Sequence, residues 1–259
     1  MRHAVAPPER SLILRHPSSP NPHHGLLGEP MTSSKTEILA RIRRAKQRAI
    51  LPDATGKTPP PPASPPFDRP LVEVFEEALF AVQGIPHRCD SVAAVADLIA
   101  EVCAQQGQTE LLAWEELPLP GLAAALHARG LATVTSRLEL PDRKEGLHAL
   151  EHLQIGLTGA HAGLARTGSI VLHADQAHGR LASLLPDIHL ALLADDRVFP
   201  DIAAWLASEE AARAIAASSN TVIITGPSRT ADIAQTLTLG AHGPRELHVI
   251  LFPSDLITR

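Results

Sequence analysis

The sequence predicts an α/β domain with a largely parallel β-sheet. Short apolar segments typical of buried strands alternate with longer segments of helical periodicity from residue 71 to the end of the chain. The 259 residues are 44% hydrophobic, which is enough to form the core of one large domain with appendages. Glycine-rich turns follow two of the expected strands, and strand ends are where parallel sheets usually bind ligands.

The first seventy residues are expected to lie outside this domain. Residues 1–30 are rich in Pro, His and Ser, so we expect them to form a disordered tail. The alternative is that translation begins at Met31, in which case residues 1–30 are included only because the start site was misassigned. Residues 31–51 are predicted to form a helix that begins with capping-box spacing from Ser34 to Glu37. Its basic face is expected to be solvated, with docking to an acidic partner as the alternative. Residues 52–70 are expected to form a stiff, proline-rich linker.

The domain itself is expected to cover residues 71–259. Along it we expect helices at residues 71–83, 92–102, 121–129 and 200–217, with Ser91 capping the second. Expected strands cover residues 109–114, 131–135, 154–158, 169–173, 189–194, 221–225 and 247–252. A short helix is expected after the turn that follows Thr225. Strands separated by helices favour parallel pairing.

Composition excludes several classes of function. A net charge of −5 and an aromatic content of 3% without tyrosine argue against nucleic-acid binding. No apolar run approaches the ~18 residues of a membrane helix, and the N-terminus lacks the apolar middle of a secretory signal. We therefore expect a cytoplasmic chain. Its two cysteines, Cys89 and Cys103, form no CxxC motif and cannot hold an iron–sulfur cluster or a Cys-rich zinc site.

The turn at residues 226–230 is the first candidate ligand site. Gly226, Ser228, Arg229 and Thr230 connect an expected strand to an expected helix, whose free N–H groups and dipole attract anions. Arg229 would add a fork of donors suited to carboxylate or phosphate. The alternatives are an ordinary helix cap by Ser228 or Thr230, and an ion pair of Arg229 with Asp232. Ser228 would be a nucleophile only beside a histidine.

Three further groups of residues are candidate walls of the same site. They are Thr158, Gly159, Thr167, Gly168 and Ser169 in glycine turns, then Arg180 and Ser183, and finally His242, Arg245 and Glu246 beside a Gly-Pro turn. Each group has an alternative explanation. The glycines would serve only turns that need a positive φ, and Arg180 would be an ordinary surface residue. Arg245 and Glu246 would form a solvated ion pair that stabilises the fold by less than ~1 kcal/mol. We expect the guanidinium groups of Arg180, Arg229 and Arg245 to converge near the carboxyl edge of the sheet.

One short motif points to different chemistry. His148, Glu151 and His152 match the H-x-x-E-H pattern, in which two imidazoles on one helix face bind zinc beside a glutamate base. The chain has 14 histidines, and a five-residue pattern with two free positions arises often by chance. We therefore expect no metal here, with zinc binding as the alternative.

Four ordered motifs resemble the lactate utilization protein C family, whose members carry the LUD domain. They are Gly156-Leu-Thr-Gly-Ala-His-Ala-Gly-Leu-Ala-Arg-Thr-Gly-Ser-Ile-Val-Leu172, Gly179-Arg-Leu-Ala-Ser-Leu-Leu-Pro-Asp187, Thr225-Gly-Pro-Ser-Arg-Thr-Ala-Asp-Ile233 and Leu239-Gly-Ala-His-Gly-Pro-Arg-Glu-Leu247. The resemblance extends from about Met31 to the end of the chain. Many relatives have an acidic residue where this chain has Arg166, and a reaction step that depends on that carboxylate would be absent or different here.

The resemblance implies a fold, partners and a function. The fold would be a three-layer arrangement similar to the NagB/RpiA/CoA-transferase-like domains. The chain would be a component of a system that oxidises L-lactate to pyruvate, with iron–sulfur clusters in partner proteins and no cofactor of its own. It would bind a small anionic ligand or a partner. Two alternatives remain: a freestanding enzyme acting on a sugar phosphate, CoA ester or folate, and a non-catalytic assembly or regulatory subunit.

Overall fold

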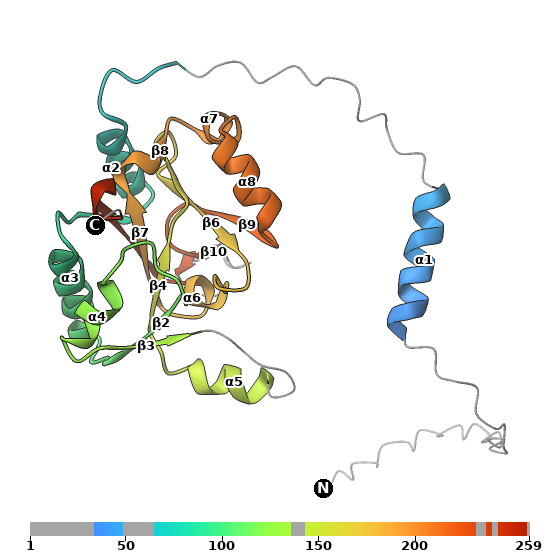
Figure 1. Ribbon diagram of the computed structural model, residues 1–259, viewed down its shortest axis with the longest axis horizontal. Coiled ribbons are helices and arrows are strands. Elements are labelled where there is room, and N and C mark those ends of the chain that lie inside the picture. Colours follow the sequence, from blue (N-terminus) through green and yellow to red (C-terminus); the bar gives the residue numbers. More distant parts are fainter. Residues whose placement is uncertain (1–33, 49–64, 136–142, 232–236, 240–242, 258–259) are drawn as a thin grey trace, which may run out of the picture. The chain divides into compact units, whose positions relative to one another are not determined.

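The computed structural model describes residues 34–48, 65–135, 143–231, 237–239 and 243–257. The chain divides into two compact units, Met1–Pro59 and Pro60–Arg259, so the boundary lies within the expected linker. The described part of the first unit is one helix, α1 (Ser34–Arg48), in the range where a helix was expected. The second unit contains every other described element (Figure 1).

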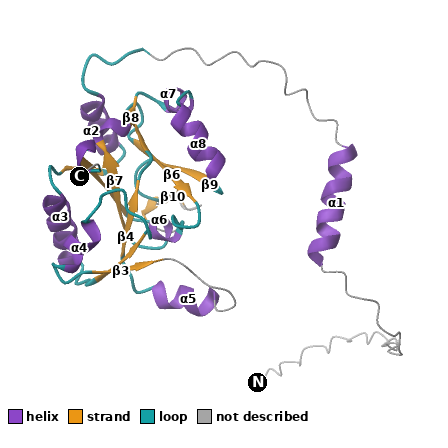
Figure 2. Cartoon of the chain, in the orientation of Figure 1, coloured by secondary structure: helices purple, strands orange, loops and turns teal. Residues whose placement is uncertain are grey.

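The second unit is built from strands and helices that mostly alternate along the chain. Its helices are α2 (Leu71–Ala81), α3 (Val92–Gln105), α4 (Leu122–His127), α5 (Arg143–Leu150), α6 (Leu181–Leu184), α7 (Ile202–Leu206) and α8 (Glu209–Ala217), with 3₁₀ turns η1 (Asp195–Arg197) and η2 (Ser254–Leu256). Its strands are β1 (Ile85–Arg88), β2 (Glu110–Ala113), β3 (Ala132–Thr135), β4 (Ile155–Gly159), β5 (Ala162–Leu164), β6 (Ser169–Ala174), β7 (Ile188–Ala194), β8 (Val198–Phe199), β9 (Asn220–Ile224), β10 (Arg229–Ala231), β11 (Leu237–Leu239) and β12 (Glu246–Phe252) (Figure 2).

A six-stranded parallel sheet forms the centre of this unit. Its strand order is β1-β12-β7-β4-β2-β3, and every neighbouring pair is parallel. Central strand β7 is buried along its whole length because both faces of the sheet are covered. Leu190 and Leu192 pack with α3 and α4 on one face, while Ala191 and Leu193 pack with α2 and α6 on the other. The predicted α/β fold with a largely parallel sheet is confirmed.

A second sheet, of order β8-β5-β6-β9, packs on the α2 and α6 side of the parallel sheet. Its inner face contributes Ile170 and Leu172 to the shared core, while Trp205 of α7 and Ala211 of α8 cover its outer face. The β5–β6 hairpin turns at Gly168, which has a φ of 61°. A Cβ atom there would lie 2.2 Å from the backbone nitrogen of Leu79, so glycine is needed for α2 to approach the turn.

The structure makes three corrections to the predicted elements. The strands expected at residues 169–173 and 221–225 exist as β6 and β9, but both belong to the second sheet. There β6 pairs antiparallel with β5 through a hairpin, and β9 pairs antiparallel with β6. The single helix expected at residues 200–217 is two helices. Ser208 separates them: its hydroxyl donates to the carbonyl oxygen of Trp205 in α7 and accepts from the amide of Ala211 in α8.

The third correction concerns the turn after Thr225. No helix begins at Arg229; the backbone forms strand β10, which pairs antiparallel with β11. Thr230 pairs with Thr238 in this ladder, and β-branched residues favour the extended backbone. The helix dipole that was expected to support an anion site at this turn is therefore missing.

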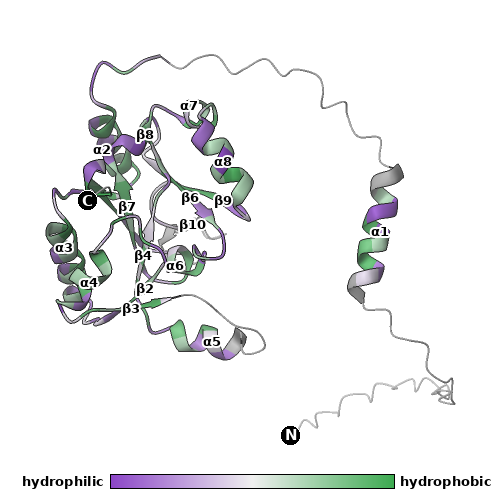
Figure 3. Ribbon diagram, in the orientation of Figure 1, coloured by the Kyte–Doolittle hydropathy of each residue, from purple (hydrophilic) through white to green (hydrophobic). Residues whose placement is uncertain are grey.

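Hydropathy follows the layers of the domain. The strands of the parallel sheet are mostly apolar, whereas the surface helices combine apolar and polar residues (Figure 3).

None of the helices in the described part of the chain has the length and apolar character needed to cross a membrane.

Candidate functional site

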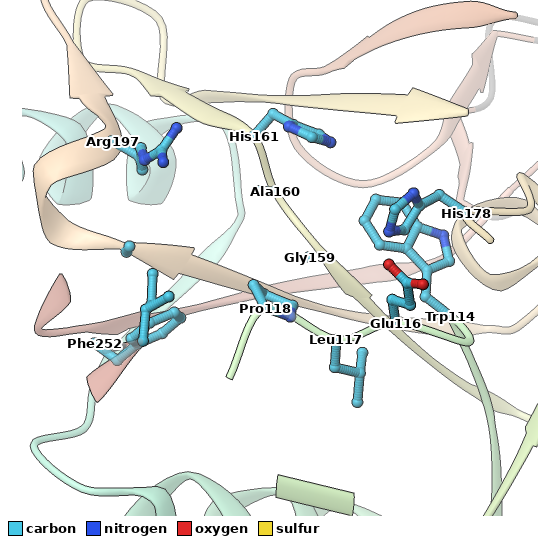
Figure 4. Close-up of a pocket in the computed structure, with 12 residues that line it drawn as sticks. Trp114, Glu116, Leu117, Pro118, Gly159, Ala160, His161, His178, Arg197 and Phe252 are labelled. Carbon is cyan, nitrogen blue, oxygen red and sulfur yellow. The ribbon is translucent and has the colours of Figure 1, made fainter. Parts of the chain in front are cut away.

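The carboxyl ends of four parallel strands surround a cavity of about 290 Å³, which we call the carboxyl-edge pocket (Figure 4). Strands β2, β4, β7 and β12 run in the same direction, so the residues that follow them meet at one edge of the sheet. The polar and aromatic residues that line the pocket are Trp114, Glu116, His161, His178 and Arg197. Leu117, Pro118 and Phe252 supply apolar surface.

Backbone and side-chain hydrogen bonds hold the pocket walls in place. The Trp114 indole donates to the carbonyl oxygen of Gly179 over 3.0 Å, which ties the end of β2 to the turn before α6. The His161 amide donates to the carbonyl oxygen of Val171 over 2.8 Å. A Cβ atom on Gly159 would lie 3.0 Å from the Pro118 ring, so glycine lets the end of β4 approach the loop after β2.

Two histidines with different environments face the pocket. The His178 Nδ1 atom lies 2.8 Å from both carboxylate oxygens of Asp175, and its ring meets Trp114 edge-on with centroids 4.5 Å apart. Burial, with smaller contributions from His173, His178 and Arg197, lowers the pKa of His161 to about 4. His161 is therefore a neutral imidazole at pH 7, able to donate or accept a hydrogen bond without carrying charge.

Arg197 brings a permanent positive charge to the opposite side of the pocket (Figure 4). Its guanidinium forms ion pairs with Glu210 of α8 and, at 3.8 Å, with Asp196. The Arg197 side chain is 37% exposed, so water and these carboxylates share its charge. Glu116 pairs with no cation among the described residues. The pocket therefore has a guanidinium on one side and a carboxylate, an indole and an imidazole on the other.

Several of the predicted site residues gather elsewhere, around a cavity of about 160 Å³ at the amino ends of β7 and β12. Ser183, Gly226 and Ser228 line this amino-edge pocket together with His189. The Nε2 atom of His189 lies 2.8 Å from the hydroxyl of the buried Thr158. We expected these residues at the carboxyl edge. They lie at the opposite edge because β9, which precedes Gly226, belongs to the second sheet.

The remaining predicted residues do not form one cradle. The Thr167 and Ser169 hydroxyls lie 2.7 Å apart, and the Ser169 hydroxyl lies 2.7 Å from that of Thr225, so they connect strands of the second sheet. Arg180 is exposed at the start of α6, and exposed Arg245 pairs with Asp187 at 3.4 Å.

Neither Arg180 nor Arg245 lines the carboxyl-edge pocket or the amino-edge pocket. Only Gly159 of the predicted set lines the carboxyl-edge pocket. Arg229 and Thr230 belong to β10, but their side chains, like the whole of His242, lie outside the described residues. Arg180 and Arg245, whose side chains are described, therefore do not converge in either of these two pockets.

The geometry does not favour the zinc alternative. Helix α5 ends at Leu150, so His152 does not continue the helical face that carries His148. His148 is bonded to Glu151 at 3.0 Å, whereas His152 faces Glu110 at 3.5 Å. Among the described residues, no three His, Cys, Asp or Glu side chains are arranged to hold a metal ion.

Arg166, where the resemblance implied a departure from an acidic residue, also lies apart from the carboxyl-edge pocket. Its guanidinium donates to the carbonyl oxygen of Pro65 over 2.7 Å and covers the Phe67 ring at 4.6 Å. These contacts attach the start of the domain to the β5–β6 turn. The position therefore has a packing role in this chain.

Sequence reasoning missed the charged and aromatic residues of the carboxyl-edge pocket. Trp114, His161 and Arg197 each follow directly or within three residues the end of a strand in the parallel sheet. Their positions after strands could have indicated a site, because the carboxyl ends of parallel strands meet at one edge of the sheet. The glycine-rich turn at residue 226 has a similar sequence signal, but the strand before it, β9, belongs to the second sheet.

The fold and the pocket define an α/β protein with a cavity at the carboxyl edge of a parallel sheet. The sequence matches the LUD domain family over residues 72–252, so the chain belongs to this family. This match, together with relatives named lactate utilization protein C, confirms the resemblance to that family.

Individual relatives match shorter stretches. An uncharacterized protein of Neisseria meningitidis is 34% identical over 41% of this chain and 46% of its own length. A protein named lactate utilization protein C from Macrococcus caseolyticus is 29% identical over 57% of this chain and 63% of its own length. A protein of the same name from Bacillus subtilis is 32% identical over 42% of this chain and 46% of its own length. A crystal structure of a DUF162 family protein from Deinococcus radiodurans has a TM-score of 0.48 and 21% identity, covering 70% of this chain and 96% of that one.

His189 gives the amino-edge pocket a measurable pH signature. Burial, reinforced by the nearby His248, lowers the pKa of His189 to about 3, far below the 6.5 of an exposed histidine. Below pH 6.5 the unfolded chain gains a proton at this residue and the folded chain does not. The free energy of unfolding is therefore expected to fall as pH decreases from 6.5 toward 3, by up to about 1.4 kcal/mol per pH unit from this residue.

Urea unfolding at a series of pH values checks this expectation. His189→Gln removes the titrating group, so its unfolding free energy should decline less steeply over that range than that of the wild type. Equal slopes for the two proteins would show that His189 is protonated as readily in the folded chain as in the unfolded chain.

Proposed function

We propose that this chain is a component of an L-lactate-oxidising system and binds a small carboxylate, of the lactate and pyruvate class, in the carboxyl-edge pocket. Membership of the LUD domain family supports the system. The names of the relatives from Macrococcus caseolyticus and Bacillus subtilis support lactate as its substrate. The observation that carries the site is the presence of both Arg197 and a neutral His161 in the lining of one pocket at the carboxyl ends of the parallel strands.

The two ends of a small hydroxy acid match these two groups. The Arg197 guanidinium presents donors in a planar fork that suits a carboxylate. The His161 imidazole carries no charge at pH 7, so it can hydrogen-bond a hydroxyl or keto oxygen. Apolar surface from Leu117, Pro118 and Phe252 surrounds the remaining space. A cavity of about 290 Å³ accommodates such a ligand together with water.

Electron transfer in this proposal belongs to partner proteins. Oxidation of lactate to pyruvate releases two electrons and two protons, which need an acceptor. The chain has two cysteines, whereas iron–sulfur clusters are typically held by four cysteine thiolates. We therefore assign the iron–sulfur clusters to partners, and to this chain the binding of the carboxylate.

Charge substitutions on α8 and η1 test the ligand site. Arg197→Gln is expected to weaken the binding of L-lactate and pyruvate about tenfold or more, because it removes a charge-assisted pair. Glu210→Gln is expected to tighten binding by about threefold, because it frees Arg197 from its ion-pair partner. Glu209→Gln is the matched control, since Glu209 is 95% exposed on the same helix and pairs with Arg213. Isothermal titration calorimetry of each purified variant gives the affinities.

The same experiment separates the two pockets. Ser228→Ala alters the amino-edge pocket without touching the carboxyl-edge pocket. If Ser228→Ala weakens binding while Arg197→Gln and Glu210→Gln do not change it, the ligand occupies the amino-edge pocket and the assignment of Arg197 is wrong.

The assignment of the clusters to partners has its own test. The tagged chain, purified from the cells that produce it naturally, is expected to bring with it partners that contain iron and acid-labile sulfide. The same chain, expressed without partners, is expected to contain no acid-labile sulfide and to leave lactate unoxidised. Lactate oxidation by the isolated chain would contradict the proposed division of labour.

A further inference from the structure

Three histidines lie together where the carboxyl-edge pocket meets the second sheet. The ring centroid of His161 is 4.5 Å from that of His173 and 6.3 Å from that of His178. His161 and His178 line the pocket, and the His161 ring is directed to the side where His178 and Trp114 lie (Figure 4). His173 lies behind them on β6 and is only 2% exposed.

His173 has a nitrogen with no partner. Its Nδ1 atom lies 3.0 Å from the hydroxyl of Thr221 on β9. Its Nε2 atom is the only buried side-chain nitrogen or oxygen, in the part of the chain that the structure describes, without a hydrogen-bond partner. Buried polar atoms in native proteins are almost always satisfied by protein, water or an ion. We therefore expect the Nε2 atom of His173 to bind a ligand, such as a water molecule or a metal ion.

The arrangement of the second sheet directs this nitrogen toward His161. Strand β6 lies between β5 and β9, and His161 directly precedes β5. The two nitrogens of an imidazole point in widely different directions. Because the Nδ1 atom of His173 faces Thr221 on β9, its Nε2 atom points away from β9, to the side where His161 lies.

His178 is held as metal-binding histidines commonly are. Its Nδ1 atom lies 2.8 Å from both oxygens of Asp175, and its Nε2 atom has no hydrogen-bond partner among the described residues. A carboxylate on one ring nitrogen fixes the tautomer and leaves the other nitrogen free to bind a metal. His173 shows the same pattern with the Thr221 hydroxyl in place of the carboxylate.

We propose that His161, His173 and His178 together bind one divalent transition-metal ion of the zinc class, with His173 and His178 contributing Nε2. Imidazole nitrogen suits zinc, cobalt, nickel and copper, whereas magnesium and calcium prefer oxygen ligands. Three protein ligands leave a fourth position of a tetrahedral ion open for a water or ligand, and two of the three histidines, His161 and His178, line the carboxyl-edge pocket. This inference does not depend on lactate being the ligand of that pocket.

Binding requires one side chain to move. As the described side chains stand, no three of them already hold a metal geometry. His161 is the residue that must turn, and it is able to do so: its imidazole makes ring contacts but no hydrogen bond with the described residues, and it borders an open cavity. His173 and His178 keep their positions through Thr221 and Asp175.

Cobalt is a suitable probe because tetrahedral Co²⁺ has intense visible absorption. The full chain, stripped with a chelator, is titrated with Co²⁺ and then with Zn²⁺. We expect one equivalent of Co²⁺ to give the tetrahedral spectrum and Zn²⁺ to abolish it, while excess Mg²⁺ does not. His161→Asn and His178→Asn are each expected to lower the affinity at least about tenfold, and Asp175→Asn about tenfold to a hundredfold.

His148→Asn is the matched control, because His148 is an exposed histidine that is hydrogen-bonded to a carboxylate but lies outside the cluster. The control is expected to bind Co²⁺ as the wild type does. Each variant is compared only after its circular dichroism spectrum matches that of the wild type. The proposal is overturned if the tetrahedral spectrum does not form, or if His161→Asn and His178→Asn bind Co²⁺ as tightly as His148→Asn.

Discussion

Burial of both faces of the six-stranded parallel sheet is the constraint on which the rest of the structure depends. Helices α3 and α4 cover one face, and α2, α6 and the second sheet cover the other. In the described part of the domain, both the carboxyl-edge pocket and the amino-edge pocket lie at strand ends of this sheet. Because β2, β4, β7 and β12 share one direction, the residues that follow them meet at the carboxyl edge, and Trp114, His161 and Arg197 form one pocket although they are far apart in sequence.

The second sheet adds histidines to that edge. The chain leaves the parallel sheet at Gly159 and forms the β5–β6 hairpin, which brings His173 of β6 beside His161, the residue before β5. Gly168 permits this hairpin, because a side chain there would collide with the backbone of α2. One hairpin thus connects the packing of α2 to the position of the pocket histidines. The carboxylate site and the metal site that we propose therefore share His161 and depend on the same turn.

The sequence predicted the fold class, most strands and the helix cap at Ser91, because apolar periodicity and capping are local signals. It did not reveal that β6 and β9 form a separate sheet, since strand pairing depends on chain reversal at Gly168. The segment after Gly226, predicted to begin a helix, instead forms strand β10. His161 was inside a quoted motif, yet its role depends on His173 and His178, which only the three-dimensional arrangement brings near.

A crystal structure of the chain with pyruvate or L-lactate bound tests the central claim most directly. The account predicts electron density for the ligand in the carboxyl-edge pocket, with its carboxylate on the Arg197 guanidinium and its second oxygen within hydrogen-bond distance of His161. Ligand density against Ser228 and His189 in the amino-edge pocket, with the carboxyl-edge pocket holding only water, would contradict it.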